Sequence, residues 1–148
     1  MSTSGLPDGV DELSAGGVVV RGDEAIVIVP TRRAADGRRV LALPKGHPDG
    51  GETSEQAAAR EVAEETGVEA ELVSALGEVG YEYERGGRRV SKLVRFYLFR
   101  YRSGELADHD HEVVEARWMP LARAAHELSY VGEREMASRA LSLVQQDR

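Results

Sequence analysis

One segment in the first half of the chain limits the fold more than any other, because it joins a glycine-rich stretch to a strong helix former. Residues Thr53–Thr66 (TSEQAAAREVAEET) have high helix propensity, and Thr53 and Gln56 have the spacing of a capping box. Gly67 follows as a helix stop. The sequence therefore predicts a helix over residues 53–66 that is entered directly from a loop.

This predicted helix carries three carboxylates on one face. Glu61, Glu64 and Glu65 are spaced i, i+3 and i+4, so they fall within about a third of the helix circumference. Their mutual repulsion is unfavourable in an isolated helix, whereas a bound hard cation would reverse the sign of that interaction. A solvated acidic face is the common alternative for a glutamate-rich helix. The residues of the preceding loop are therefore needed to distinguish a cation site from a solvated face.

The loop before the helix has features that suit a phosphate group. Gly46, Gly50 and Gly51 permit close backbone approach and unusual dihedral angles. Lys45, one of only two lysines in the chain, places a positive charge beside them. Loop and helix together predict one site for a phosphate and a hard cation such as Mg²⁺.

Elsewhere, strand and helix patterns alternate irregularly. Strands are predicted at Leu13–Val20, Ala25–Val29, Arg38–Leu43, Val68–Gly80, Val90–Tyr101 and Val113–Trp118, and amphipathic helices at Leu121–Leu128 and Gly132–Val144. Val90–Tyr101 is apolar on both alternating faces, which is typical of a central strand covered on both sides. This order predicts an α/β layered domain with a mixed sheet rather than a regular parallel array.

Length and charge restrict the class of protein further. The 148 residues suit a single domain over 1–148, with residues 1–11 expected to be flexible. Acidic residues outnumber basic ones by 26 to 19, and the resulting charge of -7 disfavours broad binding to nucleic acid. The chain has no cysteine, so a metal must bind to oxygen or imidazole. Without a long apolar run or a signal order, we expect a cytoplasmic protein that does not bind membranes.

A specific family resemblance appears in Gly46–Val68 (GHPDGGETSEQAAAREVAEETGV). This segment matches every fixed position of the Nudix box, G-x5-E-x7-R-E-U-x-E-E-x-G-U, where U is a bulky aliphatic residue. The chain thus resembles Nudix hydrolases, which implies a mixed β-sheet sandwiched between α-helices. It also implies hydrolysis of a diphosphate bond that depends on Mg²⁺, with Mn²⁺ as a substitute. The alternative from another class is a non-catalytic Nudix module that senses nucleotides, although the intact box of this chain argues against that alternative.

The resemblance also implies roles for individual residues. Glu52 and Arg60 would bond each other and hold the loop against the helix, and Glu61 or Glu65 would help to orient the attacking water. The residues implied for catalysis are Glu52, Arg60, Glu61, Glu64, Glu65 and Glu112. The implied metal ligands are Glu61, Glu64, Glu65, Glu112 and the backbone carbonyl of Lys45.

Glu112 comes from the acidic segment Asp108–Glu115 (DHDHEVVE), which precedes the last predicted strand. Nudix enzymes often take a base or an additional ligand from a later loop, and related dinucleoside-polyphosphate hydrolases carry a glutamate at about this distance before a tryptophan. Glu115 and His111 are alternatives for the same role, and a solvated acidic loop is the simplest one.

Substrate contacts are expected from two lysines and three tyrosines: Lys45 and Lys92 for phosphate, and Tyr81, Tyr83 and Tyr130 for stacking on a base. The arginine pairs, such as Arg32-Arg33, are expected to be solvated turn residues. Together with Glu112 and the PKGH segment, these residues resemble the branch that acts on diadenosine polyphosphates. A nucleoside triphosphate pyrophosphohydrolase and an ADP-ribose pyrophosphatase are alternatives. The partner is expected to be a small nucleoside phosphate, and monomer and homodimer are both left open.

Overall fold

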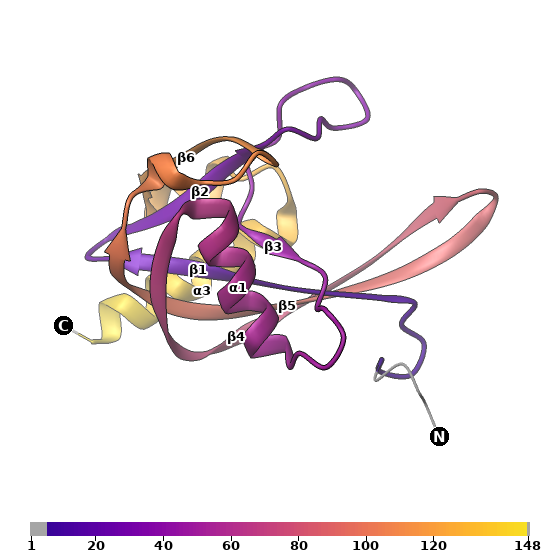
Figure 1. Cartoon of the computed structure of the whole chain (residues 1–148), viewed down its shortest axis with the longest axis horizontal. Coiled ribbons are helices and arrows are strands. Elements are labelled where there is room, and N and C mark those ends of the chain that lie inside the picture. Colours follow the sequence, from indigo (N-terminus) through magenta and orange to yellow (C-terminus); the bar gives the residue numbers. More distant parts are fainter. Residues whose placement is uncertain (1–5, 148) are drawn as a thin grey trace.

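The protein is a mixed β-sheet with helices on both of its faces, and a computed structural model describes residues 6–147 (Figure 1). The strands are β1 (Glu12–Arg21), β2 (Glu24–Pro30), β3 (Lys45–Gly46), β4 (Val68–Arg85), β5 (Arg88–Gly104) and β6 (Val113–Pro120). The helices are α1 (Ser54–Thr66), α2 (Leu121–Glu127) and α3 (Val131–Gln146), with a short 3-10 turn, η1, at Leu106–Asp108.

Strand order explains why the sheet is mixed. The order is β4-β5-β1-β2-β6, and only the β1–β5 pair is parallel, while β3 adds a short antiparallel pair to β1. One edge of β1 pairs with β5 from Glu12 to Val20. Its other edge is shared, because β3 pairs with Ala15 and Gly16 whereas β2 pairs only near Val20. The chain between β2 and β3, residues 31–44, therefore leaves the sheet and returns to it.

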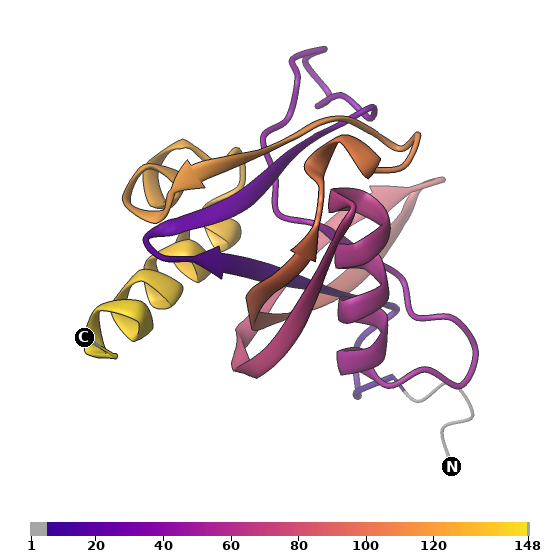
Figure 2. The same ribbon diagram turned by 60° about the vertical axis from the view of Figure 1, so that its left-hand side comes forward.

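The sheet buries a separate apolar cluster on each face. Figure 2 shows α1 on one side of the strands and α2 and α3 on the other. Along β5, Phe96 and Leu98 pack toward α2 and α3, whereas Tyr97 and Phe99 pack toward α1. This period of two with both faces buried confirms the prediction of a central strand, and the layering confirms a mixed sheet between helices.

Helix α1 forms as the sequence predicts. The Gln56 N–H donates to the Thr53 hydroxyl at 3.1 Å, and the Thr53 N–H donates to the Gln56 side chain at 2.9 Å, which completes the capping box. Gly67 ends the helix with a φ of 75°, a left-handed conformation that glycine adopts without a steric cost. Both ends of the helix are thus determined by residues next to it in sequence.

The predicted strand Arg38–Leu43 is wrong. Only isolated bridges form there, Ile28 with Ala42 and Arg33 with Arg39. The neighbouring N–H groups are taken by side chains: Leu41 donates to the Ser129 hydroxyl and Leu43 to the Glu133 carboxylate, both at 2.8 Å. These long-range bonds replace a strand ladder, and the short strand forms two residues later, at β3.

The hairpin of β4 and β5 is longer than the sequence predicts. Both strands continue through residues 81–90 to a two-residue turn at Gly86 and Gly87, where φ is 57° and 78°. Figure 1 shows this hairpin extending away from the rest of the protein. Tyr81 and Tyr83 alternate with Glu82 and Glu84 in its outer part, and only the residues around the turn, 84–89, are all charged or glycine.

The start of the chain was expected to be flexible, and residues 1–5 of that segment lie outside the described residues. Just before β1, the Asp11 N–H donates to the Ser91 carbonyl at 2.8 Å, and the Asp11 carboxylate accepts from the Ser91 N–H at 2.8 Å. Among the helices of residues 6–147, none is both long and apolar enough to cross a bilayer.

Candidate active site

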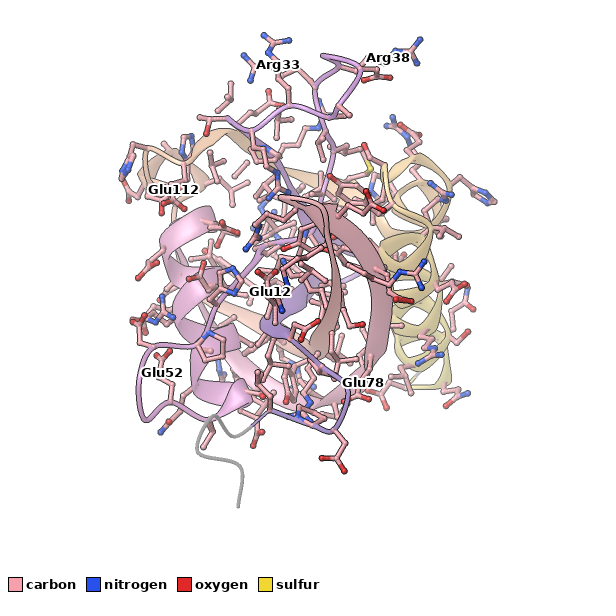
Figure 3. All side chains as sticks on the ribbon, turned by 90° about the vertical axis from the view of Figure 1, so that its right-hand side faces the viewer. Glu12, Arg33, Arg38, Glu52, Glu78 and Glu112 are labelled. Carbon is pink, nitrogen blue, oxygen red and sulfur yellow. The ribbon has the colours of Figure 1, made fainter. Side chains whose placement is uncertain are left out.

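A pocket of about 560 Å³ lies where α1, β3 and the segment after β2 come together. Five of the predicted residues line it: Lys45, Glu61, Glu65, Lys92 and Glu112. They come from β3, α1, β5 and the loop before β6, so the fold brings together residues that are far apart in sequence. Figure 3 shows Glu112 and Glu52 near opposite ends of α1.

Arg60 holds the loop against the helix, as predicted for it. Its guanidinium donates from Nε and Nη2 to the two carboxylate oxygens of Glu52, at 2.8 and 2.9 Å, and from Nη2 to the His47 carbonyl at 3.0 Å. This bidentate geometry lowers the pKa of Glu52 to about 2, with Arg60 as the main cause. Glu52 therefore remains ionised at any pH at which the protein would work. The Arg60–Glu52 ion pair, called the clamp below, thus stays charged.

The same guanidinium also positions two of the helix carboxylates. Arg60 Nη1 donates to Glu61 at 2.8 Å and lies 3.3 Å from Glu64. Glu61 packs directly against Gly46, where an added Cβ would lie 2.2 Å from the Glu61 carboxyl carbon. The first glycine of the box is thus required by the space that the Glu61 carboxylate occupies.

Glu65 is held by the backbone of the loop. Its carboxylate accepts the Lys45 N–H at 2.9 Å, and the side chain is only 8% exposed. Burial raises the pKa of Glu65 to about 8, and the nearby negative charge of Glu61 adds to the rise. Burial is also the main cause that raises the pKa of Glu61. Two buried carboxylates therefore face one pocket with too little positive charge around them.

This charge deficit fits a divalent cation. The donors available, Glu61, Glu64 and Glu65, are hard oxygens of the kind that Mg²⁺ and Mn²⁺ bind. Within residues 6–147, no three acidic or histidine side chains already surround one point, and Arg60 lies between Glu61 and Glu64. Metal binding would thus require Glu64, which is 47% exposed, to turn from Arg60.

Of the candidates before β6, Glu112 is the one at the pocket. It lines the pocket, and its negative charge contributes to the raised pKa of Glu61. Its backbone is fixed on both sides, because its N–H donates to Asp110 and its carbonyl accepts from Thr31. Glu115 instead pairs with Arg117 at 3.3 Å on β6, outside the pocket lining.

The side chain of Lys45 is already paired. Its ammonium lies 2.7 Å from a carboxylate oxygen of Glu133 on α3, whose other oxygen accepts the Leu43 N–H at 2.8 Å. Glu133 is 3% exposed, so this is a buried ion pair. The predicted phosphate contact of Lys45 would have to compete with it. Its backbone N–H, by contrast, supports Glu65 directly.

Lys92 lines the pocket, and two of the predicted tyrosines lie beside the pocket lysines. Burial is the main cause that lowers the pKa of Lys92, and its ammonium lies 6.0 Å from the Tyr81 ring centroid. Tyr81 is 44% exposed and Tyr130 is 39% exposed, with Tyr130 beside the Lys45 ammonium. The hydroxyl of Tyr83 instead donates to Glu12 at the start of β1 and accepts from Arg85 on the hairpin. Tyr81 and Tyr130 are therefore better placed than Tyr83 to meet a base.

Two residues at this site were missed from the sequence. Glu133 had a signal, because it shares the buried face of α3 with Met136, Ala137 and Ala140 at helical spacing, where a glutamate requires a partner. Arg32 is exposed, as expected for a solvated turn residue, but it also lines the pocket. No local pattern distinguishes it from Arg33, because only the path of residues 31–44 brings it there.

Comparison with known proteins agrees with this architecture. The NUDIX domain family matches residues 11–140. The chain is 44% identical over 140 residues to "Putative mutator protein MutT4" of Mycobacterium tuberculosis, covering 91% of this chain and 56% of the relative. It is 38% identical to the 8-oxo-(d)GTP phosphatase of Mycolicibacterium smegmatis over a match that covers 66% of this chain and 29% of that relative. It is 36% identical to the asymmetrical bis(5'-nucleosyl)-tetraphosphatase of Rattus norvegicus over a match that covers 55% of this chain and 52% of that relative. The chain thus spans about half or less of these relatives.

Solved structures share the fold. A NUDIX hydrolase from Nitrosomonas europaea has a TM-score of 0.72 at 19% identity and covers 88% of both chains. An Ap4A hydrolase from C. elegans has a TM-score of 0.68 at 23% identity, covering 91% of this chain and 98% of the other. The box is intact, and the family matches most of the length of this chain. The chain therefore belongs to the Nudix family.

Proposed function

We propose that the protein is a metal-dependent hydrolase of phosphoanhydride bonds in nucleoside-diphosphate-linked substrates, with diadenosine polyphosphates as the first candidates. The observation that carries this proposal is the pair of buried carboxylates, Glu61 and Glu65, facing one pocket and held by Arg60 and the Lys45 N–H. Buried carboxyl groups whose ionised forms need a cation favour a metal-dependent activity over a module that binds nucleotides without metal.

In the proposed reaction, water attacks one phosphorus of the diphosphate, and the bond from that phosphorus to the bridging oxygen breaks. The departing phosphate keeps the bonding electrons, and the proton of the water passes to a carboxylate. A divalent ion held by Glu61, Glu64 and Glu65 would supply the charge neutralisation and the acidified water that this step requires. Mg²⁺ is the first choice and Mn²⁺ a substitute. Ligation by the Lys45 carbonyl and by Glu112 belongs to the same proposal.

The chain's own residues have distinct roles in this proposal. Glu112, which lines the pocket, is the first choice for the base, with Glu61 or Glu65 as the alternative. Arg60 keeps the carboxylates in place without touching the substrate. Lys92 is proposed to contact phosphate, and Tyr81 and Tyr130 to stack on a base.

Two observations bear on the substrate. The exposed Tyr81 and Tyr130, each beside a lysine, support a substrate with bases at the mouth of the pocket, as in a dinucleoside polyphosphate. A nucleoside triphosphate, oxidised or not, is the second candidate, because relatives at 44% and 38% identity are named as a mutator protein and an 8-oxo-(d)GTP phosphatase. ADP-ribose is the third candidate. The partner is thus a small nucleotide, taken up by a monomer or homodimer in the cytoplasm.

The test is a hydrolysis panel with excess Mg²⁺ and with a chelator. It contains diadenosine tetraphosphate, canonical and oxidised nucleoside triphosphates, and ADP-ribose, with products separated by ion-exchange chromatography. We expect diadenosine tetraphosphate to give two nucleotides, only with metal. A preference for a triphosphate that gives monophosphate and pyrophosphate would select the second candidate. No turnover of any compound would contradict the proposed hydrolase and favour a nucleotide-sensing module.

A further inference from the structure

The cations of this acidic protein are largely committed to partners. Among the described residues, arginines pair with carboxylates on the hairpin, on α1 and on β6, and Lys45 pairs with Glu133. Two cations that line the pocket are different. Neither the Arg32 guanidinium nor the Lys92 ammonium makes a hydrogen bond or an ion pair within residues 6–147. In a chain with a net charge of -7, free cations gathered in one pocket require an explanation.

These cations also share one electrostatic environment. Burial is the main cause that lowers the pKa of Lys92, and the positive charges of Lys45 and Arg32 lower it further, whereas the negative charge of Glu12 acts in the opposite direction. Because Lys45 is neutralised by Glu133, Arg32 and Lys92 are the two pocket cations whose charge is not balanced by a direct partner. An anion bound between them would relieve the repulsion and offset the loss of hydration of the partly buried Lys92, while the exposed Arg32 remains accessible to it.

Arg32 starts from an anchored position. Its neighbour Thr31 donates its N–H to the Glu112 carbonyl at 2.9 Å and its hydroxyl to the same oxygen at 3.2 Å. The base of the 31–39 loop is thus tied to the segment that carries Glu112. Arg33, the next residue, bonds the Gly37 carbonyl at 3.0 Å within the loop, and Figure 3 shows it at the loop's outer end with Arg38.

The pocket therefore has walls of opposite charge. Glu61 and Glu65 provide the wall proposed to hold a cation at the diphosphate that is cut. Arg32 and Lys92, together called the second wall, line the same pocket and form no ion pair among the described residues, although Glu112 and Asp49 also line it. A ligand with negative charge only at the diphosphate would leave the second wall uncompensated. A longer phosphate chain would reach both walls, and arginine is suited to phosphate because its donors form a planar fork.

We propose that Arg32 and Lys92 form an anion subsite for phosphate groups beyond the diphosphate that is cut, and that Arg32 determines specificity for nucleotides with three or more phosphates. This inference rests on the proposed function for the identity of the substrate. The subsite itself rests on the two unpartnered cations in the pocket and can be tested without turnover.

The test measures binding of inorganic tripolyphosphate and pyrophosphate by titration calorimetry in excess Mg²⁺. We expect the wild type to bind tripolyphosphate the more tightly. Arg32→Gln and Lys92→Gln should each weaken tripolyphosphate binding about tenfold, or ~1.4 kcal/mol, while changing pyrophosphate binding less than about twofold. Arg33→Gln is the matched control, and we expect it to leave both affinities unchanged because Arg33 lies outside the pocket.

Equal losses for both probes would overturn the subsite, since they would mean that the two cations attract any phosphate anion in the pocket and do not contact an additional phosphate group. So would a wild type that binds the two probes equally, or an Arg33→Gln variant that loses as much as Arg32→Gln. The hydrolysis panel reports separately on the proposed function. If the wild type turns over no nucleotide but the Arg32-dependent preference for tripolyphosphate is found, the hydrolase proposal fails and the subsite stands.

Discussion

The two walls of the pocket are built in opposite ways. On α1, the carboxylates are engaged by neighbours: Glu61 by Arg60 and Glu65 by the Lys45 N–H, within 20 residues of each other. Arg32 and Lys92, which line the same pocket, have no such hydrogen-bonded partners among the described residues and come from segments 60 residues apart. The first wall is arranged before any ligand arrives, and the second is left free for one.

This difference separates chemistry from selectivity. A preorganised set of carboxylates can serve any phosphoanhydride, because the charge that develops during cleavage is the same in each. Selection among nucleotides is proposed to depend on groups beyond the diphosphate, for which Arg32 and Lys92 in the pocket lining and the exposed Tyr81 and Tyr130 are the candidates. Substitutions on the first wall should therefore abolish turnover of all substrates, and substitutions on the second should change their ranking.

Glu65→Gln should have the largest effect. It removes a buried carboxylate proposed to hold the metal, and we expect kcat to fall by about 10³-fold for every substrate, since metal stabilisation contributes several kcal/mol. Glu55→Gln, at an exposed glutamate in the first turn of the same helix, is the control. Steady-state kinetics across the panel measure both. Activity retained in Glu65→Gln would remove the basis for the carboxylate wall.

Glu133→Leu tests whether Lys45 belongs to the scaffold or to the free cations. It leaves a half-buried ammonium unpaired and should lower the free energy of unfolding by about 3 kcal/mol in urea denaturation. Lys45→Met should cost a similar amount, and the double variant clearly less than the sum. Additive losses would mean that the pair contributes no coupling, and that Lys45 is available to phosphate after all.

Arg60→Lys tests whether the Arg60 guanidinium positions the carboxylates of the site. Lysine keeps the charge but cannot bond both oxygens of Glu52 while reaching Glu61 and Glu64, so the carboxylates lose their alignment. We expect activity to fall by about 10- to 100-fold, with a higher Mg²⁺ concentration needed for half-maximal rate. A shift in nucleotide preference at unchanged Mg²⁺ dependence would contradict a positioning role.

Thr53→Ala should have the smallest effect. It removes one half of the capping box and should lower the stability of the protein by about 1 kcal/mol, measured by thermal or urea unfolding. Because the cap lies at the far end of α1 from Glu65, kcat should change little. A large loss of activity with intact stability would mean that the first turn of α1 contributes to the site directly.

What the sequence could predict follows the range of the interactions. The bounds of α1 were predicted to within a residue, because Thr53, Gln56 and Gly67 act on neighbouring backbone groups. The carboxylate face followed from helix geometry alone. Arg38–Leu43 failed as a strand because its hydrogen bonds go to Ser129 and Glu133, about 90 residues away.

The second wall was predicted less well for the same reason. Lys92 was predicted as a phosphate contact. Arg32 was expected to be solvated and is exposed, but its place in the pocket lining was not predicted, since nothing near it in sequence indicates the path of residues 31–44. Glu133 could have been found, as a glutamate on the buried face of α3. Its partner could not, because Lys45 is 88 residues away.

The measurement that tests the central claim most directly is binding of Mn²⁺, followed by electron paramagnetic resonance, to the wild type, Glu65→Gln and Glu55→Gln. If the carboxylate wall holds the metal, wild type and Glu55→Gln should bind Mn²⁺ alike and Glu65→Gln at least about tenfold more weakly. Equal affinity in all three proteins would show that the metal lies elsewhere, and the division of the pocket into two walls would be wrong.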